Sequence, residues 1–167
     1  QPSSIKPISL VPQTPEDFLF EALYQAWIHP RAAVDALEQA EGWLGTTFER
    51  YVRYVVYVNK SLAESNHDDA KLAKRAFDEA KDAIKERAMV LTSELYVRLA
   101  LIHTLKRNES DSEKQSWISE GVEIAEKLAG YSNTGFATVT RAWFLSDFGN
   151  DSTTAFDSWL QGLDLKN

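Results

Sequence analysis

Apolar residues recur at every third or fourth position along most of the chain, which is the spacing of one face of an α-helix. Polar or Gly/Pro-containing breaks, such as His29-Pro30 and Asn66–Asp68, divide this pattern into eight segments. The pattern therefore predicts an all-α domain over residues 16–167, built from eight antiparallel helices in four helix–turn–helix pairs. The expected helices cover residues 16–28, 31–44, 47–65, 69–87, 88–106, 113–130, 135–148 and 153–163.

One segment of the third expected helix favours a different structure. Tyr51–Asn59 reads YVRYVVYVN, and β-branched and aromatic residues of this kind are typical of a strand. The sequence contains no second run of this kind with which a strand could pair. We therefore expect a helix, since the apolar residues continue at helical spacing on one face. These residues are Phe48, Tyr51, Val52, Val55, Val58 and Leu62.

The first fifteen residues differ from the rest in composition. Gln1–Pro15 holds four of the five prolines and one charged residue. Each proline fixes its own backbone and biases the preceding residue away from helix. We expect an extended leader or linker here, followed by a helix that Thr14 caps.

The second helix of each expected pair carries a shared spacing of side chains. A first apolar residue is followed four positions later by a large one, and three positions after that by a small one. A small residue lets a neighbouring helix approach, and the larger one fills the resulting groove, as stacked hairpins require. The four sets are Ala33/Leu37/Ala40, Ala73/Phe77/Ala80, Ile118/Val122/Ala125 and Ala155/Trp159/Gly162.

This spacing resembles the tetratricopeptide repeat. Ala73, Phe77 and Ala80 match the family's pattern in the second helix of a repeat, and Tyr96, Leu99-Ala100 and His103 resemble the first-helix positions in degraded form. The resemblance implies a right-handed superhelix whose first helices line a concave groove. The sets start 40, 45 and 37 residues apart, against about 34 in the family, and none of the pairs has the full Trp-Leu-Gly-Tyr set. A compact helical bundle is the alternative.

Composition and charge narrow the class of partner. The 167 residues include 18 Lys and Arg against 25 Asp and Glu, a net charge of −7, and none of the segments is strongly basic. We therefore expect no nucleic-acid partner, because such binding depends on clustered cations. There are no cysteines, and no run of about 18 apolar residues that would predict a membrane span. The sequence leaves the cellular compartment open.

Candidate catalytic and metal-binding motifs are weak. Nucleophile elbows, phosphate-binding loops and dinucleotide fingerprints do not occur. Glu64-x2-His67 has the spacing of one half of a di-iron carboxylate site, but such a centre needs a second motif that this sequence lacks. The sequence thus predicts a protein that is not an enzyme, with no metal site and no cofactor.

Aromatic and arginine side chains supply the candidate binding residues. The five tryptophans lie among apolar neighbours, so we expect them in the core. The third expected helix has a second face rich in Arg and Tyr, which are residue types that dominate protein interfaces. We expect this face, with two arginines elsewhere, to anchor an acidic or carboxylate-bearing feature of a partner. Alternatively, the tyrosines pack on the next hairpin and the arginines pair with acids of a neighbouring helix. The candidates are Arg50, Arg53, Tyr54, Tyr57, Arg98 and Arg141.

Two functions from different classes agree with these features. The first is a non-catalytic scaffold or adaptor domain that binds a protein or peptide segment on a helical groove. The second is a helical bundle that encloses a small apolar ligand in its aromatic interior. The last expected helix also suggests a homodimer contact, through Phe156, Trp159, Leu160, Leu163 and Leu165.

Overall fold

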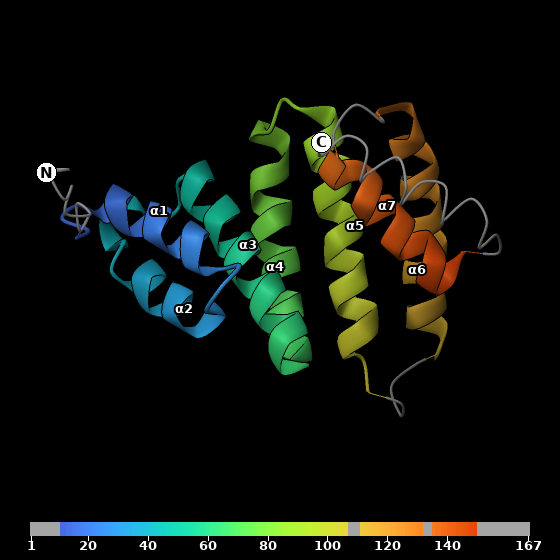
Figure 1. The fold of residues 1–167 in the computed structure, drawn as a ribbon, viewed down its shortest axis with the longest axis horizontal. Helices are drawn as coiled ribbons and strands as arrows, with labels where there is room; N and C mark the ends of the chain where they lie inside the picture. Colours follow the sequence, from blue (N-terminus) through green and yellow to red (C-terminus); the bar gives the residue numbers. More distant parts are fainter. Residues whose placement is uncertain (1–10, 107–110, 132–134, 150–167) are drawn as a thin grey trace, which may run out of the picture.

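The computed structural model describes residues 11–106, 111–131 and 135–149, and within them it forms seven α-helices and no strand (Figure 1). The prediction of an all-α chain is confirmed. The eighth expected helix, its dimer contact and most of the leader lie outside the described residues. The α-helices are α1 (Pro15–Gln25), α2 (Pro30–Glu38), α3 (Thr47–Glu64), α4 (His67–Ala80), α5 (Arg87–Thr104), α6 (Asp111–Leu128) and α7 (Gly135–Phe148), with short 3-10 helices η1 (Glu41–Trp43), η2 (Lys81–Ala83) and η3 (Ala129–Tyr131).

Polar side chains cap the first, third and fourth helices. Thr14 accepts the backbone N–H of Asp17, and the Asp17 carboxylate accepts the backbone N–H groups of Gln13 and Thr14 at 3.0 Å each. Those two bonds lower the pKa of Asp17. Thr46 begins α3 and Asn66 begins α4 with equivalent side-chain caps. Each cap satisfies backbone donors that have no partner inside the helix, which fixes where these helices begin.

The segment Tyr51–Asn59 is helical, as the apolar periodicity predicted. It lies inside α3, where Val52, Val56 and Val58 are buried. A strand here would leave its backbone groups without a partner strand, whereas α3 satisfies them internally and buries the valine face. Tertiary packing therefore outweighs the β-propensity of these residues.

Two expected helices end well before the position that the apolar pattern indicated, whereas the other early ends differ by three residues or fewer. The helix expected over 31–44 ends at Glu38 and continues as η1, before Gly45 takes a left-handed φ of 81°. The helix expected over 69–87 ends at Ala80 and continues as η2, before Ile84 becomes extended. The second ending was missed because residues 81–86 contain neither Gly nor Pro.

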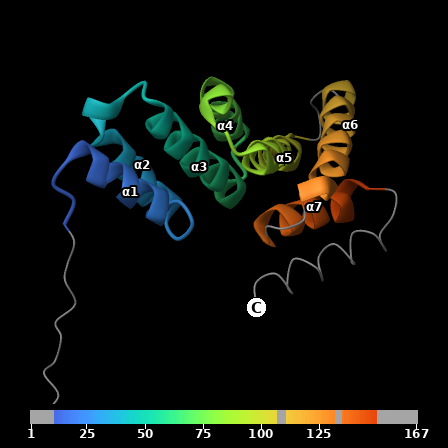
Figure 2. The ribbon, with the colours of Figure 1, turned by 90° about the horizontal axis from the view of Figure 1, so that it is seen from above.

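The helices pack in chain order. Successive pairs α1–α2, α3–α4 and α5–α6 are in contact, and α1, α3, α5 and α7 also contact one another in succession. Seen from above, α3 to α7 follow a curved row in which α4 and α6 take one side and α3, α5 and α7 the other (Figure 2). The odd-numbered helices thus share one continuous face.

The spaced residues recognised in the sequence lie at the contacts between helices. Five alanines of these sets are fully buried, and Leu37 and Phe77 are buried between them. Because an alanine side chain adds only one carbon, neighbouring backbones can approach closely at each position. The alanines are Ala33, Ala40, Ala73, Ala80 and Ala125. The fourth set, Ala155/Trp159/Gly162, lies outside the described residues.

Candidate binding pocket

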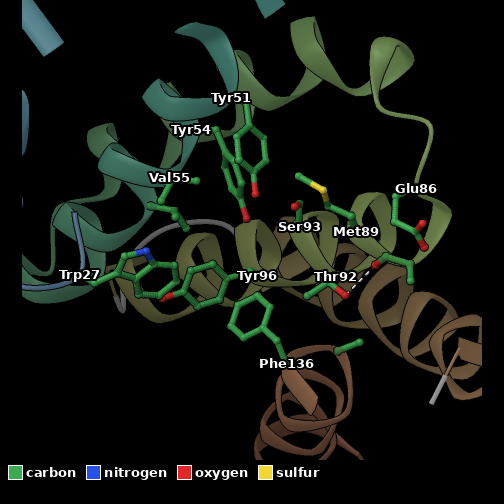
Figure 3. Close-up of a pocket in the computed structure, with 13 residues that line it drawn as sticks. Trp27, Tyr51, Tyr54, Val55, Glu86, Met89, Thr92, Ser93, Tyr96 and Phe136 are labelled. Atoms are coloured by element: carbon green, nitrogen blue, oxygen red, sulfur yellow. Dashed lines mark hydrogen bonds between the residues drawn. The ribbon is translucent and has the colours of Figure 1, made fainter. Parts of the chain in front are cut away.

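A pocket of about 210 Å³ opens on the face formed by the odd-numbered helices (Figure 3). Trp27 contributes from the turn after α1, Tyr51 and Tyr54 from α3, and Phe136 from α7. The floor comes from α5, whose residues Ala88, Met89, Thr92, Ser93 and Tyr96 line it. The stacking of the odd helices therefore brings together side chains from along most of the described chain.

Three aromatic rings form one end of the pocket. Trp27 and Tyr96 are nearly parallel, with ring centroids 6.3 Å apart and planes 20° apart. Phe136 stands across both, with centroids 6.1 Å from Trp27 and 6.4 Å from Tyr96, at angles of 89° and 72°. Trp27 remains 55% exposed and Phe136 51% exposed. Large rings left exposed together around a pocket are typical of binding surfaces.

Hydroxyl groups line the opposite wall. The hydroxyls of Tyr51, Tyr54 and Ser93 point into the cavity (Figure 3). Tyr54 is hydrogen-bonded to the Ser93 side chain, and burial raises the pKa values of Tyr54 and Tyr51. The Tyr96 hydroxyl donates to Asn59 Oδ1 at 3.0 Å, and burial raises the pKa of Tyr96 to about 12. These tyrosines therefore stay protonated at neutral pH and offer neutral hydroxyl groups.

Glu86 is the one charged residue among those that line the pocket. It is the N-cap residue of α5, yet its side chain makes no capping hydrogen bond. Its sequence neighbours Lys85 and Arg87 are exposed and do not line the cavity. The pocket thus combines aromatic rings, neutral hydroxyls and a carboxylate.

The structure distributes the sequence-predicted tyrosines over two surfaces. Tyr54 is almost fully buried and borders the aromatic pocket. Tyr57 and Arg53 lie together at a separate pocket of about 430 Å³, beside Leu37 and Leu72. The structure therefore brings Arg53 and Tyr57 together on one side of α3 and directs Tyr54 to another.

Each sequence-predicted arginine contacts an acceptor within the chain. Arg53 pairs with the buried Glu49, and Arg50 Nε lies 3.5 Å from Glu79 Oε2 on α4. Arg98 Nη2 lies 2.5 Å from Glu120 Oε2, which joins α5 to α6. Arg141 on α7 donates from Nε to the carbonyl oxygen of Ala125 on α6 at 2.9 Å, and burial lowers its pKa.

Several pocket residues were not among the sequence candidates. Trp27 was expected in the core, and that expectation is wrong, because it lies in the turn after α1 with more than half its surface exposed. Trp143 is likewise exposed. Met89, Ser93 and Phe136 lie on apolar helical stripes whose exposure depends on how the hairpins stack. The sequence did offer one signal for Trp27. This residue lies two positions before the His29-Pro30 break, at the end of a helix and not in its middle.

Other kinds of site find little support in the described part of the chain. No group of three or more acidic or histidine side chains is placed there to hold a metal ion. No described helix has the length and apolar character needed to cross a membrane. Comparisons with protein-family models, with curated proteins and with solved structures found no match.

Proposed function

We propose that this chain is a non-catalytic protein–protein interaction domain that binds a partner segment on the face of α1, α3, α5 and α7. One side chain of that segment occupies the aromatic pocket. The observation that carries this proposal is the exposure of Trp27 and Phe136 at the rim of the pocket. Residues from the turn after α1 and from α3, α5 and α7 line this pocket together. Rigid aromatic rings supply large contact areas with little loss of side-chain entropy, which is why they anchor many interfaces.

The order of helix contacts supports the resemblance to tetratricopeptide repeats. In such arrays the first helix of each hairpin faces the groove, and the second helix covers it from outside. Here α1, α3, α5 and α7 contact one another in succession, and each contributes its own helix or its following turn to the pocket. A partner segment running across these helices reaches the pocket midway along its path.

The size of the pocket favours a side chain over a whole ligand. Sites for drug-sized molecules usually enclose about 300–1,000 Å³, whereas this cavity holds about 210 Å³. The volume suits one large side chain, with the rest of the segment lying over the exposed rings. The alternative of a small apolar ligand is therefore less well supported, although a molecule near the size of benzene would fit.

The arginine face is a second surface for the same function. Arg53 and Tyr57 border a second pocket between α2, α3 and α4. Glu38 and Glu41 line this pocket too and would repel an acidic partner. An acidic group binding there must compete with Glu49 for Arg53, and at Arg50 it must compete with Glu79. The aromatic pocket involves no such competition, so we place the primary site there.

Selection of a random peptide library against the purified chain tests this proposal. Peptides selected on the wild type are re-measured on the Trp27→Ala/Phe136→Ala double variant. Phe20→Ala is the matched control, because Phe20 is also 55% exposed, lies on α1 and does not line the pocket. We expect affinity to fall about tenfold or more for the double variant, and to stay within twofold, roughly the error of the measurement, for the control.

Three results contradict the proposal. Peptides that bind the wild type and the double variant equally place the binding surface elsewhere on the chain. A library that yields no enriched peptide removes the peptide-binding function. A native mass of the purified chain that exceeds its denatured mass, by an amount lost in the double variant, identifies a bound small molecule instead.

A further inference from the structure

We infer that the side chain seated in the aromatic pocket is basic, a lysine or arginine of the partner segment. Its alkyl stem lies against the rings of Trp27, Tyr96 and Phe136, and its charged end faces Glu86. This inference rests on the proposed function, since it names the chemistry of the anchor that this function requires. The partner side chain would thus be positively charged, whereas the arginines of α3 would select a negatively charged one.

The pocket carries a negative charge, on Glu86, that can pair with a cation from a partner. Glu86 lies at one end of the cavity and Trp27 at the other, and no lysine or arginine lines the wall between them (Figure 3). Within the described part of the chain, the Glu86 carboxylate forms no ion pair, unlike Glu49, Glu64 and Glu120. A cation entering the pocket therefore gains its attraction without displacing an internal partner, and an anion would be repelled.

The aromatic wall suits a cation with a long apolar stem. Lysine and arginine bury their methylene groups on apolar surface while the charged end stays near polar groups. The ring faces of tryptophan and tyrosine also attract cations through their quadrupole. Because Trp27 and Tyr96 are nearly parallel and Phe136 stands almost perpendicular to Trp27, the rings form two walls of a corner in which a linear stem can lie.

The hydroxyl groups of the pocket can accept hydrogen bonds in addition to the one between Tyr54 and Ser93. The oxygens of Tyr51, Tyr54 and Ser93 point into the cavity and carry lone pairs that an ammonium or guanidinium group can satisfy. A purely apolar side chain would exclude water from these oxygens and leave them without a replacement. The Thr92 hydroxyl donates to the carbonyl oxygen of Ala88 at 2.7 Å, which leaves its own lone pairs able to accept as well.

The charge of the whole chain points the same way. A net charge of −7 attracts a basic segment from a distance and accelerates its encounter with the acidic protein. The net charge acts over the whole surface, whereas the charge of Glu86 lies at the pocket itself. The two contributions can be separated by changing Glu86 alone.

Met89 provides a direct reporter for the test. It is the only methionine of the chain, and it lines the pocket, so a methyl-labelled methionine gives an NMR signal that senses occupancy. The probes are n-butylammonium and n-propylguanidinium as cations, n-pentanol as a neutral molecule of similar size, and pentanoate as an anion. Titrations at about 150 mM NaCl suppress attraction to distant charges.

We expect both cations to shift the Met89 signal with an affinity at least about fivefold above that of n-pentanol, and pentanoate not to bind. Glu86→Gln should lower the affinity for n-butylammonium by about fivefold and leave that for n-pentanol unchanged. The control is Asp82→Asn, which removes the same charge from an exposed residue of η2 that does not line the pocket. Its cation affinity should match that of the wild type.

Glu86→Gln is a suitable test variant because Glu86 makes no capping hydrogen bond. Its replacement therefore leaves the start of α5 intact. Circular dichroism of both variants verifies the fold. Equal binding of n-butylammonium and n-pentanol, or equal cation binding by Glu86→Gln and wild type, overturns the basic anchor. So does a Met89 signal that no cation moves.

The proposed function has its own separate result. Peptides that lose affinity on Trp27→Ala/Phe136→Ala but contain no lysine or arginine support the binding face and overturn the basic anchor. Failure to select any peptide overturns the function itself. The two claims therefore fail in distinguishable ways.

Discussion

The ring of Phe144 on α7 occupies the space that a side chain at Gly121 on α6 would need. A Cβ atom built on Gly121 would lie within 3.0 Å of the Phe144 ring. Phe144 is fully buried, so its ring cannot turn into solvent to make room. The absence of a side chain at position 121 thus sets how closely α6 and α7 approach.

This contact predicts that Gly121→Ala destabilises the fold. Overpacking at the ring should lower the free energy of unfolding by about 1–3 kcal/mol, even though alanine alone favours a helix over glycine by about 1 kcal/mol. Urea unfolding followed by circular dichroism measures the change. Gly130→Ala is the control, because a Cβ there meets nothing within 4 Å, and it should stay within about 0.5 kcal/mol of wild type. A Gly121→Ala protein as stable as the control would show that α6 and α7 pack differently.

The arginines of α3 should differ in their contribution to stability. The Glu49 side chain is 1% exposed, with Arg53 as its ionic partner and the backbone N–H of Gly45 at 3.4 Å. Arg53→Ala leaves this carboxylate without its cation and should lower the free energy of unfolding by about 1–3 kcal/mol. Arg50→Ala breaks a surface pair with Glu79 and should cost less than about 0.5 kcal/mol.

Melting temperatures of the two single variants, measured side by side, test this difference. Equal and small shifts in melting temperature would mean that Arg53 is not needed to stabilise Glu49. Arg53 would then be available for an acidic partner.

The pair between Arg98 and Glu120 should make stability depend on pH in the acid range. The hydrogen bonds from Arg98 lower the pKa of Glu120 in the folded state below its ordinary value of 4.5. The unfolded state therefore binds a proton first as the pH falls, so the pair stabilises the fold above pH 4.5 and loses this contribution below it. Because Glu120 is almost half exposed, the effect is at most about 1 kcal/mol.

Comparison of Glu120→Gln with wild type isolates this contribution from that of other carboxylates. The variant should be less stable at pH 7, and the difference should shrink to nothing as the pH falls through the folded-state pKa. Glu126→Gln, a change of an exposed residue on the same helix, should follow the wild type throughout. A Glu120→Gln difference that persists undiminished in acid would contradict the ionic origin of the effect.

Ser65→Gly should stabilise the chain. Ser65 ends α3 in the left-handed conformation, with φ 51° and ψ 42°, which costs a residue with a Cβ about 1 kcal/mol or more. Glycine adopts this conformation freely but loses more entropy on folding, so the net gain should be about 0.5 kcal/mol. Ser65 is exposed, and no packing is lost. The melting temperature should rise, and Ser65→Ala, which keeps a Cβ, should not raise it.

Much of the fold could be predicted from the sequence because helix starts are determined by residues close together in the chain. Thr14, Asn66 and the prolines fix helix starts through hydrogen bonds within a few residues, and the buried alanines mark contacts between helices. The end of α4 was missed because no Gly or Pro marks it. Gly121 was missed for another reason: its role depends on Phe144, which lies on a different helix.

The candidate site was harder to predict for the same physical reason. Periodicity identifies the apolar stripe of a helix, but the curvature of the stack decides which part of it stays exposed. Trp27 was therefore expected in the core and Phe136 was not singled out, although both border an open pocket. The Arg and Tyr residues of α3 were predicted to share one face, but the structure places Tyr54 at the aromatic pocket and Arg53 and Tyr57 at another. The acids that Arg50 and Arg53 contact were not predictable individually.

The ring contact between Trp27 and Phe136 joins segments that are otherwise remote in the stack. A row of hairpins that touch only their neighbours tends to unfold from its ends, one unit at a time. A molecule held between these rings would bind only when both ends of the row are folded, and would therefore suppress such partial unfolding. Amide hydrogens in α2 and α6, which do not line the pocket, should then exchange more slowly when it is filled.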